Sequence, residues 1–318
     1  MPSPFAQTRQ AAEAPPASPP RYGLLFAAQQ VMVEAGLYSA PSGPGMAEGF
    51  PAPLTTDLRW QGGLQWAPEQ TLGGGIIGID CYGATDAMTT DTNPAITTAD
   101  PVVVYAEDHC STLGWKGRDF EGRARRQLEA TQSYRIANEL WMGTLAQSET
   151  LDNAWLTDDP KIVSGAAVAP AEALALIDIG LAHMLGGRRG MIHVSPQVLD
   201  QLATNNSITL TGQLWLSPMG NIVVADAGYP GTEPLNAAGS DQWIFGTSIV
   251  TYRLSDVQII PGTFSDAQKI AQSMNRSIND ITIYAQREVL LQWDWNIPAG
   301  NKFGVVAAET TTAAFTAL

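Results

Sequence analysis

At 318 residues, 45% of them hydrophobic, the chain is long enough to bury a substantial core or two lobes, which excludes an intrinsically disordered protein. Only 15% of the residues are charged, against roughly 25% in typical soluble domains, so we expect part of the surface to be hidden against other copies of the chain, because interface cores are depleted in charge. An ordinary secreted β-rich protein is the alternative, and the formal net charge of −14 excludes a dedicated nucleic-acid binder, whose affinity comes mainly from Lys and Arg.

The first residues are expected to form an arm. Residues 1–20 contain six prolines among Ala, Ser and Gln, a composition that cannot form a core of its own. A neighbouring surface is the simplest way to order such an extended segment, so the arm indicates assembly. Residues 1–22 also lack the apolar stretch of a signal peptide, and no apolar run reaches the roughly 20 residues that span a bilayer. We therefore expect synthesis in the cytoplasm and no membrane contact.

Residues 22–115 are rich in Gly, Pro, Thr and Asp and are predicted to form short strands and long loops, with apolar pieces at 75–79 and 102–105. Cys81 and Cys110 are too few to hold a fold of this size together. In a reducing compartment they are expected as buried small hydrophobes rather than as a disulfide. No repeat of roughly 20–50 residues is visible, which disfavours solenoids and propellers.

Two helices are predicted next. Residues 118–142 contain no proline and one glycine, Gly122, and apolar residues recur there at helical intervals. This segment is predicted to be one helix on the order of 35 Å long, ending near Gly143. A second helix is predicted to begin at Pro170 and to stop at Gly186-Gly187.

Short strands and turns follow. A strand is predicted at 191–194, and Ser195-Pro196 is expected to cap and open a short helix through Leu202. Between 208 and 260, strand-like pieces at 222–224 and 243–253 alternate with turn residues such as Gly228-Tyr229-Pro230-Gly231. A short helical piece is predicted from Ser265.

Residues 281–295 alternate with period two and are predicted to form one long strand. At about 3.3 Å per residue it would run on the order of 50 Å, far beyond the usual 5–6 residues of a globular strand. Arg287 lies on its apolar face and needs a carboxylate or carbonyl partner if it is buried.

The chemical motifs do not indicate a cofactor or metal site. Gly73-x-Gly75-x-x-Gly78 matches a dinucleotide fingerprint by letters, but the pattern neither follows a predicted strand nor opens a predicted helix, so a flexible turn is the better interpretation. The three histidines, His109, His183 and His193, stand in no ligand pattern, and structural roles are expected for them. We predict no catalytic, cofactor-binding or metal-binding residues.

A carboxylate-dependent hydrolase remains an alternative, because a glycosidase needs only two facing carboxylates. Such residues in Gly/Thr-rich loops are more often turn formers that hydrogen-bond their own backbone. The candidates in the first third are Asp80, Asp86, Asp91, Asp100, Glu107 and Asp108.

One basic cluster surrounds the predicted long helix. Two interpretations stay open: a solvated face with i,i+4 pairs such as Arg125–Glu129, or a weak, sequence-independent contact with a polyanion or with a partner's acidic surface. The cluster consists of Lys116, Arg118, Arg123, Arg125, Arg126 and Arg135.

From residue 117 onward the order of predicted elements resembles the major capsid protein of tailed bacteriophages, the Johnson or Hong Kong-type fold. The match is one of pattern: a long helix, a helix, a strand entering a Ser-Pro-capped helix, short strands and a very long strand. By this resemblance residues 117–142 correspond to the spine helix, 191–196 to the axial-domain strand that runs into a helix, and 281–295 to the peripheral-domain strand.

The resemblance implies an α+β fold in five segments: an N-terminal arm at 1–59, an extended loop with peripheral strands at 60–116, a peripheral domain with the spine helix at 117–165, an axial domain at 166–262, and a peripheral return strand with the C-terminus at 263–318. Trp60, Trp66, Trp115 and Trp155 lie in loop-like sequence and would be either interface anchors or buried.

The implied function is self-assembly into pentamers and hexamers of an icosahedral head shell around the phage genome. Scaffold, portal and decoration proteins are implied partners, together with weak, non-specific contact of the basic cluster with packaged DNA. The implied location is the virion after synthesis in the host cytoplasm. An encapsulin-type shell and another virion part, such as a tail tube or decoration protein, are the alternatives that also assemble.

Overall fold

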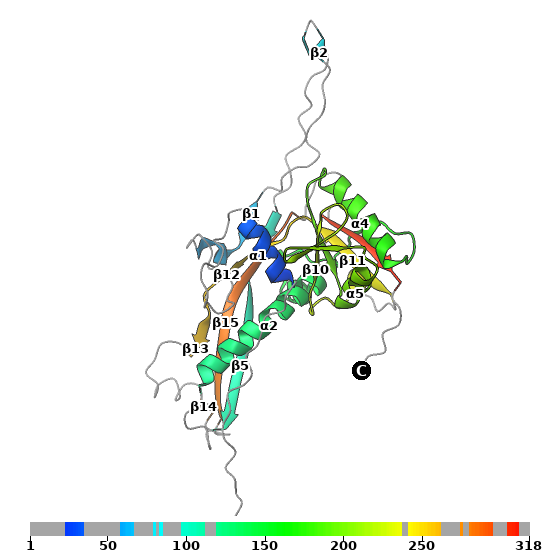
Figure 1. Ribbon diagram of the computed structural model, residues 1–318. Coiled ribbons are helices and arrows are strands. Elements are labelled where there is room, and N and C mark those ends of the chain that lie inside the picture. Colours follow the sequence, from blue (N-terminus) through cyan, green and yellow to red (C-terminus); the bar gives the residue numbers. More distant parts are fainter. Residues whose placement is uncertain are drawn as a thin grey trace, which may run out of the picture.

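The computed structural model describes residues 23–34, 58–66, 79–80, 83–84, 97–111, 119–236, 241–261, 274–275, 280–294 and 304–311. Figure 1 shows two lobes joined near the C-terminal end of one long helix, α2 (Phe120–Met142). The architecture is α+β, as predicted. No helix in the described ranges is long and apolar enough to cross a membrane.

The elongated lobe consists of α2 and an antiparallel sheet built around the long strand β15 (Asp280–Gln292). β5 (Val102–Ser111) pairs with β15 over ten residues, from Asp280↔Ser111 to Val289↔Val102. The remaining strands that pair with β15 are β12 (Thr251–Leu254), β13 (Gln258–Ile260) and β14 (Met274–Asn275). The predicted long strand is confirmed, but it ends at Gln292 rather than at residue 295, because pairing with β12 stops there.

The length of β5 was predicted wrongly. The sequence suggested a short strand at 102–105, whereas the strand continues to Ser111. Its second half alternates exposed Glu107 and His109 with buried Ala106 and Asp108. The polar residues at these positions hid the strand in the sequence, although they alternate between an exposed face and a face that α2 covers.

α2 confirms the predicted long helix. The Asp119 carboxylate accepts a hydrogen bond from the Gly122 amide at 2.8 Å and caps the first turn, and Gly143 closes the helix in a left-handed conformation. Arg287, on the covered face of β15, donates from Nε to the Ser255 carbonyl oxygen at 3.0 Å and from Nη1 to Gln132 Oε1 at 3.2 Å. The expected carbonyl partner is confirmed, and burial lowers the pKa of Arg287 from its ordinary value.

The compact lobe is a mixed seven-stranded sheet with helices α4 (Pro170–Met184) and α5 (Pro196–Thr204). The sheet order is β6 (Lys161–Ile162), β16 (Val305–Thr310), β11 (Gln242–Thr247), β7 (Met191–Val194), β10 (Ile222–Ala225), β9 (Leu214–Leu216) and β8 (Thr209–Thr211). α4, β7 and the helix capped by Ser195 are all confirmed, with Ser195 Oγ accepting from the Val198 amide.

Each face of this sheet has its own hydrophobic cluster. Alternate residues such as Ile192, Val223 and Ile244 pack with α4 and α5. Their neighbours Met191, Ile222 and Phe245 join a larger cluster that continues through α2 into the elongated lobe. The period-two alternation of the strands thus assigns one face to each cluster.

Two predictions in 208–260 need correction. The strand-like piece 243–253 is two strands in different sheets, β11 and β12, because the chain crosses between the lobes at 248–250. The turn predicted at 228–231 lies two residues earlier, where the Tyr229 amide donates to the Asp226 carbonyl oxygen at 3.0 Å. As a result the expected axial segment 166–262 and the expected return segment 263–318 each supply strands to both lobes.

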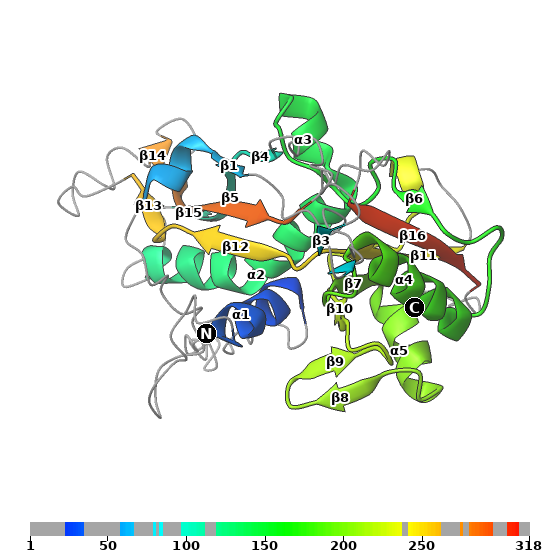
Figure 2. The same cartoon turned by 90° about the horizontal axis from the view of Figure 1, so that it is seen from above.

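A helix absent from the predictions is α1 (Leu24–Glu34), which the sequence suggested as arm, loop or short strand. Its residues Leu24, Leu25, Ala27, Ala28 and Met32 are buried in the larger cluster. Figure 2 shows α1 alongside α2.

The rest of the described chain comprises η1 (Leu58–Gly62), β1 (Leu64–Trp66), β2 (Ile79–Asp80), β3 (Gly83–Ala84), β4 (Thr97–Ala99), α3 (Thr144–Glu149) and η2 (Pro234–Asn236). The Gly73–Gly78 motif, Cys81 and the piece from Ser265 lie outside the described residues.

Gly228 lets the turn after β10 approach the backbone of α2. A Cβ atom at this position would lie 2.2 Å from the Tyr134 carbonyl oxygen and 2.8 Å from the Asn138 nitrogen. Because both neighbours are backbone atoms of a helix, we expect Gly228→Ala to destabilise the fold by about 1–3 kcal/mol. Gly165→Ala is the control, since its Cβ would meet no atom within 4 Å. Urea unfolding measures both, and equal midpoints for the two variants would contradict the prediction.

His193 in β7 is completely buried and has a structural role. Its Nε2 lies 2.9 Å from Thr247 Oγ1, whose hydroxyl donates to the Ser248 carbonyl oxygen, so Nε2 carries the proton. Its Nδ1, 2.9 Å from the Tyr229 hydroxyl, then accepts. Burial lowers the pKa of His193 to about 3.

The pKa of His193 predicts a loss of stability in acid. Between its unfolded pKa of about 6.5 and its folded pKa of about 3, the unfolded state binds the extra proton. This group's contribution is therefore complete above pH 6.5 and falls by about 1.4 kcal/mol per pH unit as the pH drops below that value. We expect His193→Gln, which can still donate and accept, to flatten the curve of unfolding free energy against pH from 6 to 4. Parallel curves for the wild-type and variant proteins in urea titrations would refute this prediction.

Candidate interaction surfaces

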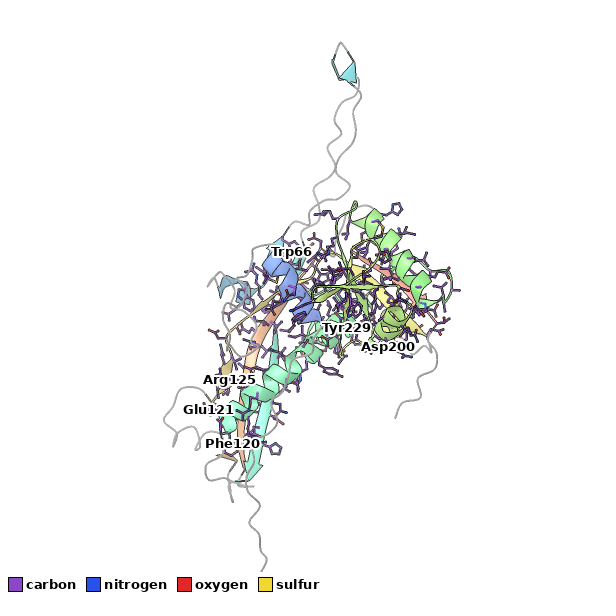
Figure 3. The ribbon with its side chains drawn as sticks, viewed as in Figure 1. Trp66, Phe120, Glu121, Arg125, Asp200 and Tyr229 are labelled. Atoms are coloured by element: carbon purple, nitrogen blue, oxygen red, sulfur yellow. The ribbon has the colours of Figure 1, made fainter. Side chains whose placement is uncertain are left out.

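The predicted basic cluster is only partly gathered on α2. Arg123, Arg125 and Arg126 are exposed near the N-terminus of the helix, while Lys116 and Arg118 lie outside the described residues. Figure 3 places Arg125 with Phe120 and Glu121 toward one end of the elongated lobe, far from Tyr229 at the compact lobe.

Two of these arginines are paired within the chain. Arg123 Nη2 lies 3.2 Å from Asp108 Oδ1, and Arg126 Nη1 lies 3.6 Å from Asp119 Oδ2. The ion pairs of the described residues do not include the expected pair between Arg125 and Glu129. The surface at this end of α2 is therefore less positive than the sequence suggested.

Arg135 lies apart from the other arginines of the basic cluster. It lies nine residues beyond Arg126, on the order of 14 Å along the helix. Its Nη1 donates to the Tyr105 carbonyl oxygen at 2.6 Å, and its guanidinium lies 5.8 Å from the centroid of the Tyr105 ring. Arg135 thus binds β5 at the edge that does not pair with β15.

The face of the long sheet opposite α2 carries exposed apolar side chains. Val103, Tyr105, Tyr284 and Ile260 are each between 36% and 51% exposed. The rings of Tyr105 and Tyr284 meet edge to face with centroids 6.3 Å apart, and Tyr284 stands opposite Ile260 on β13. We call these four residues the tyrosine face. They alternate with polar side chains across the strand pair, since Glu107 stands opposite Tyr284, Gln286 opposite Tyr105 and Glu288 opposite Val103. Exposed tyrosines within such a mixed surface are common at protein–protein contacts.

Of the tryptophans expected either as interface anchors or as buried residues, Trp60 is buried, while Trp66 and Trp155 are half-buried. Trp60 is buried with Ala99 and Leu290. Trp66 Nε1 donates to Asp294 Oδ1 at 3.1 Å, and the Trp155 ring lies directly over Gly143, where a Cβ would come within 2.1 Å of it. Trp115 lies outside the described residues.

Two of the described carboxylates, Asp100 and Glu139, line a pocket, while the candidates Asp86 and Asp91 lie outside the described residues. A pocket of about 40 Å³ is lined by Asp100 and Glu139 among tryptophans, but Glu139 accepts from the Leu145 and Ala146 amides and Asp100 accepts from the Asp152 amide. Such a volume holds only a few waters. No group of three or more metal-ligating side chains is found in the described ranges.

The carboxyl groups with a raised pKa lie elsewhere. Burial and the neighbouring Asp159 raise the pKa of Asp158, and burial with Asp241 raises that of Glu309. Glu309 and Asp241 also share a side-chain hydrogen bond. Both shifts follow from acidic groups placed close together, and neither residue lines the pocket of Asp100 and Glu139.

A second pocket, of about 270 Å³, lies at the junction of the lobes and includes Arg188 and Arg189. Neither arginine belongs to the basic cluster predicted around the long helix. The available signal was two consecutive basic residues directly after the Gly186-Gly187 stop, in a stretch otherwise poor in positive charge.

No protein-family model and no curated protein matches the chain. Among solved structures it is similar to a protein of Gordonia phage Cozz, with 9% identity and a TM-score of 0.48, covering 98% of this chain and 92% of that one. It is similar to the capsid of the native GTA particle, with 12% identity and a TM-score of 0.44, covering 85% and 96%. It is also similar to the SrpI encapsulin of Synechococcus elongatus, with 11% identity and a TM-score of 0.42, covering 86% and 95%.

Proposed function

We propose that the chain is a major capsid protein that assembles with copies of itself into an icosahedral shell enclosing a phage genome. The tyrosine face is the observation that carries this proposal. It is a group of four part-exposed apolar side chains, two of them tyrosines, on the sheet face opposite α2. Such a surface is stabilised when another subunit covers it.

The free edge of β5 supports the same conclusion. Ten residues of strand present an edge that does not pair within the described residues, and Val103 and Tyr105 on it are exposed. Soluble monomers usually protect such edges with proline, bulges or a covering loop. In a shell the neighbouring subunit provides the cover.

The segments of the fold are proposed in the same terms. Residues 1–59 would form an arm whose helix α1 is anchored in the core, and 60–116 an extended loop that returns as β5. The segment 117–165 would form the peripheral domain, with α2 as its spine. Most of 166–262 would form an axial domain around the symmetry axes, and 263–318 would return through β15 to close the compact sheet with β16.

Closed pentamers and hexamers are the proposed assemblies, because heterologous contacts between identical subunits generate rings when the rotation closes. Scaffold, portal and decoration proteins are further proposed partners. Contact with packaged DNA would be weak, since Arg123 and Arg126 are already paired with carboxylates.

An encapsulin-type shell is the second candidate, and the tyrosine face favours both equally. Cargo distinguishes the two: DNA for a capsid and protein for an encapsulin.

Assembly of the purified chain tests the proposal. We expect negative-stain images and light scattering to reveal closed shells or rings of five and six subunits. A monomer of 33.9 kDa under all buffer conditions would contradict the proposal.

The tyrosine face is tested by the double variant Tyr105→Glu/Tyr284→Glu. Burying two carboxylates at an interface is costly, so we expect the concentration at half-assembly to rise by at least about tenfold. Tyr134→Glu is the control, because Tyr134 is equally exposed but lies on α2. Thermal melting checks that both variants remain folded. Assembly of the double variant at the wild-type concentration would show that this face is not an interface.

A further inference from the structure

β5 has one open edge. In the described part of the chain this strand pairs with β15 alone, so the backbone groups on its other side have no strand partner there. Because the backbone groups of alternate residues point to opposite sides of an antiparallel strand, every second residue of β5 presents its N–H and C=O groups at that edge. An open edge of this kind can pair with a strand of another molecule.

The edge differs in composition along its length. Its second half carries the charged Glu107 and Asp108 and the polar His109, and charged side chains on an edge strand oppose pairing with a further strand. Its first half, Val102–Ala106, has three consecutive valines and no charge, a composition that favours pairing between molecules. Pro101, which lacks a backbone N–H, directly precedes this stretch. Val102–Ala106 is therefore the part of the edge that most needs protection.

Arg135 contacts the edge within this stretch. It comes from α2, which covers the face of β5 that carries the buried Val104 and Ala106. Its Nη1 donates to the Tyr105 carbonyl oxygen at 2.6 Å, and its guanidinium lies 5.8 Å from the centroid of the Tyr105 ring. That ring stands on the opposite face, next to Tyr284. To make both contacts, the Arg135 side chain passes around the edge from one face of the strand to the other.

We infer that Arg135 is a gatekeeper, a residue that keeps the Val102–Ala106 edge of a free subunit from pairing with a strand of another copy. An added strand needs the Tyr105 carbonyl oxygen as an acceptor, and that oxygen already binds a charged donor. Hydrogen bonds from charged donors are roughly twice as strong as neutral ones, so a backbone N–H displaces Arg135 poorly. The guanidinium also places a positive charge where the partner strand would lie.

This role goes beyond the proposed assembly, because it concerns the subunit before it meets its neighbours. Strand addition at an open edge can continue from copy to copy into aggregates, whereas a shell requires contacts that close. By occupying the edge, Arg135 keeps free subunits available for the closed contacts.

Removal of the guanidinium tests the inference. Arg135→Ala frees the Tyr105 carbonyl oxygen, and Arg125→Ala is the matched control, because both arginines are exposed on α2 and either change takes the formal net charge from −14 to −15. Thioflavin T fluorescence and the infrared signal of intermolecular β-sheet measure edge pairing in the purified full-length chain. We expect edge-paired aggregates to form at least about tenfold faster for Arg135→Ala than for Arg125→Ala.

A rescue variant separates edge pairing from a loss of stability. Val103→Lys adds a charge to the same stretch of the edge, so in the Arg135→Ala background we expect it to restore the slow aggregation of the control. Thermal melting verifies that all variants are folded. Aggregation of Arg135→Ala at the rate of the control overturns the inference, and so does fast aggregation that Val103→Lys leaves unchanged. Because the readout is aggregation of free subunits, the test does not depend on whether shells form.

Discussion

The structure depends on one helix that serves two sheets. The N-terminal half of α2 covers the long sheet, and its C-terminal end packs in the compact lobe, where the fully buried Trp141 ring lies 5.1 Å from Tyr229 and 4.8 Å from Phe245. Trp141 Nε1 also donates to Thr232 Oγ1 at 3.0 Å. One hydrophobic cluster runs from Ala285 in β15 to Ala307 in β16, so the elongated lobe shares its core with one face of the compact sheet, while the other face has a separate cluster under α4 and α5. The angle between the lobes is therefore set by packing around α2 rather than by a linker.

Asp226 adds the polar counterpart of that junction. Its buried carboxylate accepts from the Leu24 amide at 3.0 Å, from Ser133 Oγ at 2.9 Å and from the Gly228 amide at 3.1 Å. A buried carboxylate is tolerated only with such donors, so α1, α2 and the turn after β10 are held together by one group. Gly23 makes the approach possible, since a Cβ there would lie 2.5 Å from Asp226 Oδ2. The start of α1 is thus fixed on the body of the protein.

Sequence patterns predicted the elements whose signals are local. The long helix ending at Gly143, the helix opened by Pro170, the Ser195 cap and the alternation of β15 all follow from neighbouring residues. α1 escaped prediction because it is apolar on most sides and has its first amide capped by Asp226, 202 residues away. The basic cluster is divided for a similar reason. Arg123 pairs with Asp108 and Arg135 binds the Tyr105 carbonyl oxygen, and both partners lie on β5, whose full length the sequence pattern did not predict. Local periodicity carries no information about such partners.

The shape of the elongated lobe determines how much of its sheet a single subunit leaves exposed. An antiparallel sheet commonly packs one face on the core and leaves the other in water, and here α2 covers the packed face. On the other face the described chain buries only the end near Leu290, under Trp60 and Ala99, and leaves the tyrosine face exposed. Extending β15 to thirteen residues lengthens the lobe and enlarges that uncovered area with each added pair. The long strand that gives the lobe its length therefore also enlarges the surface that a neighbouring subunit would cover in the proposed shell.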